Sequence, residues 1–133
     1  MKARILLVDD NINLTTLLGK ALTRNGYECH VQNNAVIATE TARGVQPDLV
    51  LLDVMMPGKD GGDVLAELRA DRLLREVPVI MLTALAAEAE GIAGMGGINS
   101  PVLGKPVDLG NLLVTIQQEL VAAQQSQVAL LAR

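Results

Sequence analysis

The chain has 133 residues, half of them hydrophobic and a fifth charged, so its composition predicts one globular domain and excludes a disordered segment. A formal net charge of −4 without any basic run counts against binding of nucleic acid by this segment. No apolar run has the length of a membrane-spanning helix, and the first eight residues are too short for a signal peptide. The sole cysteine, Cys29, excludes an internal disulfide. We therefore expect a cytoplasmic protein without a membrane contact.

Apolar strands alternate with helices along the whole sequence. Runs that are apolar at every position are typical of strands covered on both faces, whereas apolar residues at helical spacing between a polar start and a glycine stop indicate helices. The predicted elements are, in chain order, a strand over residues 4–8, a helix from Asn11 or Asn13 to Gly26, a more polar strand over 27–32, a helix from Asn33 or Asn34 to Gly44, a strand over 49–53, a helix from Asp63, a strand over 79–82, a helix over 86–95, a strand over 102–104 and a long helix capped by Asp108.

Five strands that alternate with five helices predict right-handed crossovers and a parallel sheet with helices on both faces. This is the doubly wound α/β class, and we expect the flavodoxin-like strand order 2-1-3-4-5. The carboxyl ends of the first and third strands are then neighbours at the point where the strand order reverses, which is where such sheets bind ligands.

Polar side chains follow four of the five predicted strands. Asp9 and Asp10 follow the first strand, Asp53 ends the third, Thr83 the fourth, and Lys105 the fifth. All these strand ends share one rim of a parallel sheet. Two carboxylates about 4 Å apart repel each other by about 4 kcal/mol at an effective dielectric constant near 20, and the lysine offsets only part of this. The cluster therefore predicts either a raised carboxyl pKa or a bound cation.

Mg²⁺ fits such a cluster because it prefers oxygen ligands and is often shared with a phosphate. We expect Asp10 and Asp53 as direct ligands, Asp9 in support, and the backbone carbonyl of Met55 as a further ligand. The absence of a nearby histidine or cysteine disfavours zinc.

An aspartate at a metal site can also attack phosphorus and become an aspartyl phosphate. The Thr83 hydroxyl could then donate a hydrogen bond to one phosphoryl oxygen, the Lys105 ammonium could contact another, and Ala84 would leave room for the incoming group. Each residue also has a simpler structural interpretation: Asp53 as a turn or helix cap, Asp9 and Asp10 as solvated helix-start acids, Thr83 as a turn residue and Lys105 as a surface cation. One shared site explains their common rim better than four coincidences.

Together, Asp9 and Asp10, the stretch 52–61 (Leu-Asp-Val-Met-Met-Pro-Gly-Lys-Asp-Gly), Thr83 with Ala84, and Lys105 with Pro106 resemble the receiver domain of two-component response regulators. The resemblance covers about residues 3–120. It implies that Asp53 accepts a phosphoryl group from a phosphohistidine of a histidine kinase or phosphotransfer protein, that Asp9, Asp10 and the Met55 carbonyl surround Mg²⁺, and that Thr83, Ala84 and Lys105 contact the phosphoryl group. It also implies a cis peptide bond before Pro106.

One position departs from the family pattern. Members usually carry tyrosine or phenylalanine three residues before the lysine, at a place where this chain has Val102. Valine is too small to make the inward shift that the ring makes on activation, so the usual aromatic readout is in question while the phosphorylation chemistry is not. The lone histidine, His30, lies in a predicted edge strand, and we interpret it as structural or solvated and not as a phosphodonor.

The C-terminal third carries the expected output features. Gly91 and Gly94 weaken the helix over 86–95, which we expect to be short, mobile or shifted before phosphorylation. The final helix has a seam with 4-3 spacing whose early half is expected to face the sheet. Residues 1–122 then form the receiver domain and residues 123–133 a helical extension that pairs with a second chain or leads to an output domain. The seam residues are Leu109, Leu113, Ile116, Leu120, Ala123, Gln127 and Leu130.

Three functions compete. The first is a phosphoacceptor signalling domain, and no output module is encoded in these 133 residues. The second is an aspartyl-phosphate-forming phosphatase of the haloacid-dehalogenase type, which is disfavoured because Asp9, Asp10 and Asn11 lack the Asp-x-Asp pattern and the chain has no room for a cap domain. The third is a degenerate receiver that only binds a partner, which is disfavoured because every expected residue type of the active site is present.

Overall fold

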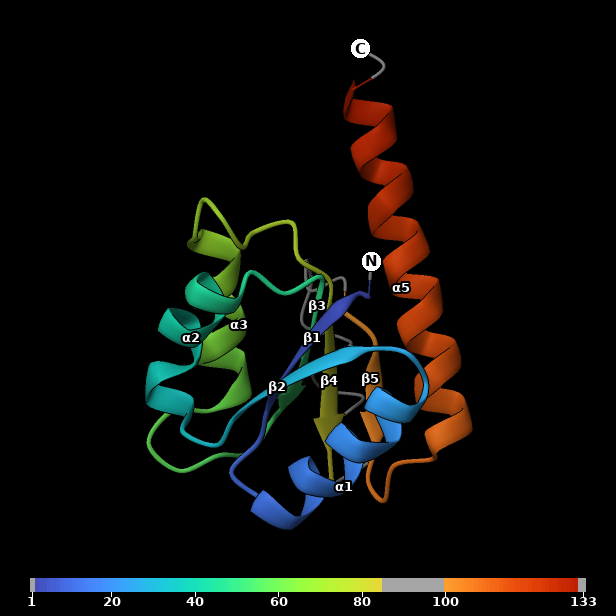
Figure 1. Ribbon diagram of the computed structural model, residues 1–133. Coiled ribbons are helices and arrows are strands. Elements are labelled where there is room, and N and C mark those ends of the chain that lie inside the picture. Colours follow the sequence, from blue (N-terminus) through green and yellow to red (C-terminus); the bar gives the residue numbers. More distant parts are fainter. Residues whose placement is uncertain (1, 85–99, 132–133) are drawn as a thin grey trace.

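The computed structural model describes residues 2–84 and 100–131, and there it shows a five-stranded parallel sheet between two layers of helices (Figure 1). The strand order β2-β1-β3-β4-β5 confirms the predicted flavodoxin-like arrangement. The predicted helix over 86–95, with its expected shortness or mobility, lies outside the described residues. The strands are β1 (Arg4–Val8), β2 (Glu28–Gln32), β3 (Leu49–Asp53), β4 (Val79–Thr83) and β5 (Val102–Gly104), and the helical elements are α1 (Ile12–Arg24), the 3₁₀ turn η1 (Ala35–Ile37), α2 (Ala38–Val45), α3 (Gly61–Ala70) and α5 (Leu109–Leu131).

The two faces of the sheet bury two separate apolar clusters. Successive residues of a strand point to opposite faces, so Leu6 and Val8 of β1 pack with residues of α2 and α3, whereas Ile5 and Leu7 pack with residues of α1 and α5. Figure 1 shows these helix pairs on opposite sides of the sheet. The central strands β3 and β4 are buried at every position, which is why their sequences show no polar alternation.

The predicted helix from Asn33 is wrong in its first turn. The chain there forms the separate 3₁₀ turn η1, because the side chain of Asn34 accepts the backbone N–H of Val36 (3.0 Å) and starts a tighter turn. Val36 and Ile37 are exposed as a result, and only Ala35 of this turn is buried. The α-helix proper begins after η1.

Helix α3 begins two residues before the predicted start at Asp63. The carboxylate of Asp60 accepts the N–H of Asp63 (2.9 Å), so Asp60 is the N-cap and Gly61 is the first helical residue. Asn11 caps α1 by accepting the N–H of Leu14 (3.0 Å), which decides between the two asparagines that the sequence left open.

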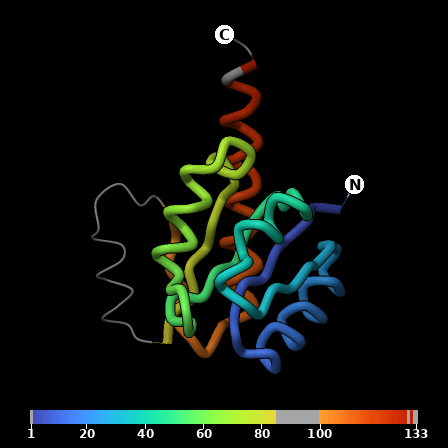
Figure 2. The backbone as a smooth tube through the Cα atoms, turned by 90° about the vertical axis from the view of Figure 1, so that its left-hand side faces the viewer, coloured from blue at the N-terminus to red at the C-terminus, as the bar shows by residue number. Residues whose placement is uncertain are grey.

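Helix α5 is continuous from end to end and starts at the predicted cap, since Asp108 accepts the N–H of Asn111 (3.1 Å). Leu112 and Ile116 in its first half are fully buried in the core. Both views show its C-terminal turns extending beyond the rest of the protein (Figures 1 and 2). Across residues 2–84 and 100–131, no helix has both the length and the apolar character that crossing a bilayer requires.

Gly61 lies directly against the end of β3. Its N–H donates to the carbonyl of Val54 (2.8 Å). A Cβ atom on residue 61 would overlap the carbonyl oxygen of Asp53 and lie 2.8 Å from the Cα of Val54. Both obstacles are backbone atoms, so they cannot yield without moving the strand end that carries Asp53.

Replacing Gly61 with alanine should therefore lower the free energy of unfolding by about 2 to 3 kcal/mol, because overpacking against fixed backbone is relieved only by distortion. Urea unfolding followed by far-ultraviolet circular dichroism measures this. The matched control is Gly44→Ala in α2, where the added Cβ has no neighbour within 4 Å and the better helix propensity should stabilise by up to about 1 kcal/mol. A Gly61→Ala protein as stable as the wild type would contradict the proposed contact.

Candidate functional site

Three carboxylates meet where β1 and β3 end. The two strands are neighbours, and Val8 pairs with Leu52, so Asp9 and Asp53 follow the same rung of the sheet. Asp10 is the next residue of the turn after β1, and one carboxylate oxygen from each of the three aspartates lies within 4.8 Å of the others. Asp9 and Asp53 are buried whereas Asp10 is exposed, so the cluster opens to solvent on one side.

Lys105 reaches this cluster from the other side of β4. Its ammonium donates to Asp9 Oδ2 (2.9 Å) and to Asp53 Oδ1 (3.2 Å). Its backbone N–H donates to the carbonyl of Thr83 (2.7 Å), which fixes the lysine at the end of β5. The peptide bond between Lys105 and Pro106 is cis. One ammonium therefore lies between the two buried carboxylates.

The environment of the cluster shifts the pKa values of Asp53 and Lys105. Burial raises the pKa of its carboxyl to about 6, and the negative charge of Asp9 acts in the same direction, while Lys105 and the N–H of Met55 oppose the shift. Burial acts to lower the pKa of Lys105, but its contacts with Asp9 and Asp53 outweigh this and the pKa is raised. Lys105 thus stays charged, and it does not fully compensate the carboxylates.

Backbone groups fix the orientation of both buried carboxylates. Asp9 Oδ1 accepts the N–H of Asn11 (2.9 Å), which leaves its other oxygen for Lys105. Asp53 Oδ1 accepts a longer bond from the N–H of Met55 (3.4 Å). The side chain of Met55 is exposed, so only its backbone contacts the cluster.

Of the remaining predicted residues, Thr83 and Ala84 lie on the same rim, whereas Val102 and His30 do not. Thr83 is buried at the end of β4, and Ala84 after it is exposed. Val102 is half-buried and packs against the apolar cluster under α2 and α3. His30 is away from the aspartates on the edge strand β2, where its Nε2 lies 2.8 Å from Glu28 Oε2.

The donor set fits a hard cation. All three side chains offer carboxylate oxygens, and one ammonium balances only part of their charge. Burial and the charge of Asp9 together keep the pKa of Asp53 raised. The cluster could therefore hold a metal ion, with Asp10 on its open side.

The profile of the response regulator receiver domain matches residues 5–117. The chain belongs to the response regulator receiver family. This confirms the family that the motifs resemble.

Curated relatives of this receiver domain include longer regulators. The chain is 41% identical over 108 residues to response regulator PleD of Caulobacter vibrioides, which covers 81% of this chain and 24% of PleD. It is 40% identical over 114 residues to transcriptional regulatory protein TcrA of Mycobacterium tuberculosis, which covers 86% of this chain and 44% of TcrA. The chain thus spans less than half the length of these two relatives.

Solved structures share the fold of this receiver domain. The BeF3-activated N-terminal receiver domain of Klebsiella pneumoniae RstA superposes with a TM-score of 0.77 at 29% identity and covers 88% of this chain and 97% of that one. Chemotaxis protein CheY4 of Vibrio cholerae superposes with a TM-score of 0.81 at 26% identity and covers 90% and 99% of the two chains.

Sequence reasoning missed one residue that touches the receiver site. The sequence pattern predicts a helix start at Asn33, whereas in the structure its amide nitrogen donates to the carbonyl of Asp9 (2.7 Å). In the sequence, Asn33 is distinguished only as a polar residue directly after an edge strand. Many residues fit that description, so it does not predict a hydrogen bond to a residue 24 positions away.

The raised pKa of Asp53 makes a prediction about stability. The native carboxyl keeps its proton up to about pH 6, whereas the unfolded one loses it near 3.8, so the native state binds more protons between these values. Stability from this group therefore falls as pH rises through that window. Asparagine has no such proton, so the stability of the Asp53→Asn protein relative to the wild type should rise across the window. At pH 7 without divalent cations it should be higher by about 3 kcal/mol.

Urea titrations from pH 4 to pH 8 with a chelator present measure this difference. Glu67→Gln serves as a contrast, because hydrogen bonds from Lys59 and Thr39 lower the pKa of Glu67, and its loss should become more destabilising as pH rises. An Asp53→Asn protein that is less stable than the wild type at pH 7 would contradict the repulsion inferred at the site.

Proposed function

We propose that this chain is a phosphoacceptor signalling domain in which Asp53 takes a phosphoryl group from the phosphohistidine of a histidine kinase or phosphotransfer protein. The observation that carries the proposal is the buried Asp53 carboxylate, which shares the ammonium of Lys105 with Asp9 in the acidic cluster. A carboxylate oxygen of Asp53 would attack phosphorus, the bond from phosphorus to the histidine nitrogen would break, and the imidazole would keep the electron pair and take up a proton.

Mg²⁺ would be held by the carboxylates of Asp9, Asp10 and Asp53 and by the backbone carbonyl of Met55. When bound, it supplies positive charge that offsets the repulsion among the carboxylates and between them and a phosphoryl group. The three carboxylates with oxygen atoms within 4.8 Å of one another support this set.

The phosphoryl group would be contacted by Lys105, Thr83 and Ala84. The ammonium of Lys105 already donates to Asp53, so a small movement transfers its hydrogen bond to a phosphoryl oxygen. The hydroxyl of Thr83, at the end of the adjacent strand, would donate to a second oxygen, and the small side chain of Ala84 would leave space for the group.

Val102 bears on how phosphorylation is read out. It is half-buried against the apolar cluster and pairs with Met81 across β4 and β5. We infer that this receiver switches without the movement of an aromatic ring at this position.

Turnover of a phosphate ester is the competing activity. The chain is proposed to be a phosphoacceptor and not an enzyme, because the proposed nucleophile Asp53 ends the third strand and no Asp-x-Asp pattern follows the first. The contacts among Asp9, Asp53 and Lys105 also favour a competent site over a degenerate receiver used only for binding.

Incubation with acetyl phosphate and Mg²⁺ should add the mass of one phosphoryl group to the wild-type chain and none to the Asp53→Asn chain. Intact-mass spectrometry measures both, and Asp60→Asn is the matched control because Asp60 caps α3 outside the cluster. Multiple turnover of a phosphate ester with no trapped adduct would favour the phosphatase, and no labelling in Mg²⁺ would favour the degenerate receiver.

The partners proposed for this domain are a histidine kinase or phosphotransfer protein and, through α5, a second copy of the chain. Residues 123–133 would form an extension beyond the receiver domain of residues 1–122. Between Leu109 and Leu131 only Glu119 is charged, and the valines at positions 114, 121 and 128 form an exposed stripe with a seven-residue repeat. This stripe faces away from the seam that the sequence suggested, whose early residue Ile116 is buried in the core.

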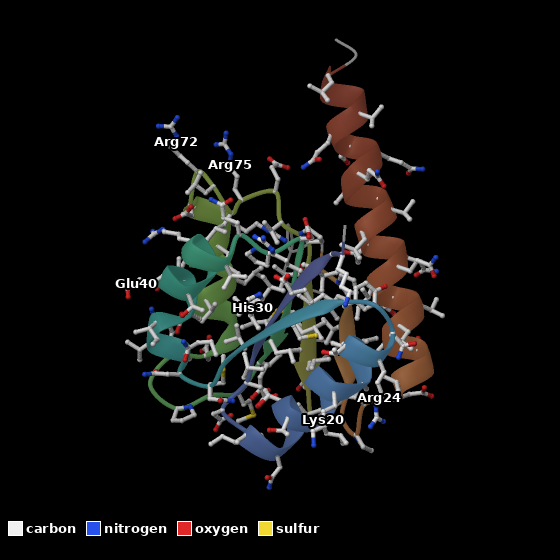
Figure 3. The ribbon with its side chains drawn as sticks, viewed as in Figure 1. Lys20, Arg24, His30, Glu40, Arg72 and Arg75 are labelled. Atoms are coloured by element: carbon white, nitrogen blue, oxygen red, sulfur yellow. The ribbon has the colours of Figure 1, made fainter. Side chains whose placement is uncertain are left out.

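No role in nucleic-acid or membrane binding is proposed for this domain, and the cytoplasmic location stays a prediction. In support, four of the basic side chains lie as two pairs at opposite ends of the protein, Lys20 and Arg24 on α1 and Arg72 and Arg75 in the turn after α3 (Figure 3).

Light scattering should detect a dimer at high protein concentration that is weakened by the double substitution Val121→Glu and Val128→Glu, because two like charges then enter the contact. The control is Ala122→Glu with Ala129→Glu, which adds the same charges about 100° further around the helix. A wild-type monomer at high concentration, both with and without a phosphoryl analogue, would refute the pairing and leave a connection to an output domain as the role of the extension.

A further inference from the structure

The acidic turn after β1 is tied to the segment after β2 by the side chain of one residue, Asn33. We propose that Asn33 is a positioning residue for the cation site, because its amide group holds the backbone on which Asp9 and Asp10 are mounted. This inference rests on the proposed function of the cluster as a Mg²⁺-dependent phosphoacceptor site.

Two hydrogen bonds from one nitrogen carry the proposal. Asn33 Nδ2 donates to the carbonyl oxygen of Asp9 (2.7 Å) and to Thr15 Oγ1 (3.0 Å), which uses both N–H groups of the amide. Thr15 is buried in the first turn of α1, and its own hydroxyl proton can go to the carbonyl of Ile12 (3.1 Å). The amide therefore joins the end of β1 to the start of α1.

Asn33 is itself held in place by the sheet. The N–H of Asp9 donates to the carbonyl of Gln32 (3.3 Å), which extends the pairing of β1 with β2 by one bond. The side chain of Asn33 then closes the same connection from the next residue. The turn is thus clamped on its N–H side by backbone and on its C=O side by the Asn33 side chain.

The carbonyl that Asn33 holds belongs to the peptide bond between Asp9 and Asp10. Within residues 2–84 and 100–131, the structure gives the side chain of Asp10 no hydrogen bond or ion pair, and this side chain is exposed. The direction of its carboxylate depends on the backbone of the turn, since nothing described holds the side chain directly. Groups that orient the ligands of a metal typically change its affinity by 10-fold to 100-fold when they are removed.

The neighbouring asparagine offers a matched control. Asn34 also uses its side chain in a hydrogen bond to backbone, but it accepts the N–H of Val36 in η1 and does not contact the turn. Removing the Asn34 side chain also costs a hydrogen bond to backbone, although one exposed bond is lost there and two partly buried ones are lost with Asn33. Only the loss of Asn33 should change the affinity of the acidic cluster for a cation.

The test compares Asn33→Ala, Asn34→Ala and the wild-type chain by isothermal titration calorimetry with Mg²⁺. Asn33→Ala should raise the dissociation constant for Mg²⁺ about 10-fold, and Asn34→Ala should leave it unchanged. In a Mg²⁺ titration of labelling by acetyl phosphate, the half-saturating concentration should rise by the same factor, while the rate at saturation stays close to that of the wild type. A merely structural role would lower stability in urea without moving the Mg²⁺ midpoint.

A second variant guards against misfolding. Asn33→Leu keeps the branching and the number of heavy atoms of the side chain and removes its donors, so it should show the same shift as Asn33→Ala. Wild-type Mg²⁺ affinity in either folded variant, or a lower labelling rate at every Mg²⁺ concentration with an unchanged midpoint, overturns the positioning role. If the wild-type chain itself neither binds Mg²⁺ nor becomes labelled, the proposed function fails together with this inference.

Discussion

The ammonium of Lys105, shared between Asp9 and Asp53, is the interaction on which the site depends. It allows two carboxylates to be buried side by side at the end of a sheet, but one positive charge does not balance three aspartates. Burial of the Asp53 carboxyl, with the negative charge of Asp9 acting in the same direction, raises its pKa and costs the folded state stability near neutral pH. The net negative charge of the three aspartates is also the reason why we expect the cluster to bind a cation next to Asp53. Stability and function are therefore opposed at this one point of the fold.

The strand order of the sheet brings these carboxylates together. Because β1 and β3 are parallel neighbours, the residues that follow them emerge on the same edge at adjacent positions. Gly61 lets α3 begin close against the end of β3, and Asn33 holds the turn after β1 from the side of β2. Both residues act on backbone, and backbone position decides where the carboxylates of Asp10 and Asp53 lie. The geometry of the site thus depends on uncharged residues such as Gly61 and Asn33 as well as on the charged residues themselves.

Helix α5 has two different faces along one continuous length. Its first half covers the sheet with Leu112 and Ile116, while its last turns extend beyond the protein and carry almost no charge. A solvated helix without charged residues gains little from exposure, which is why contact with another chain or domain is the natural explanation of the extension. The exposed valine stripe lies on the face opposite the core. The sequence seam and this stripe are therefore two separate patterns on the same helix.

The sequence by itself determined the strands, their parallel order and the residue types of the site. Unbroken apolar runs identified β1, β3 and β4, and a charged or hydroxyl residue at each strand end predicted a common rim, because parallel strands place their carboxyl ends together. Tertiary structure alone decided what depends on distance between remote segments. It showed that Lys105 bonds to Asp9 and Asp53 and that Asn33 reaches a carbonyl on another strand. It also showed that Asp60 caps α3, which begins at Gly61 and not at Asp63, and that Asn34 starts a 3₁₀ turn. The spacing of apolar residues along the sequence indicates whether a segment is a helix or a strand and which side of it is buried. A single hydrogen bond between residues far apart in the sequence produces no such pattern.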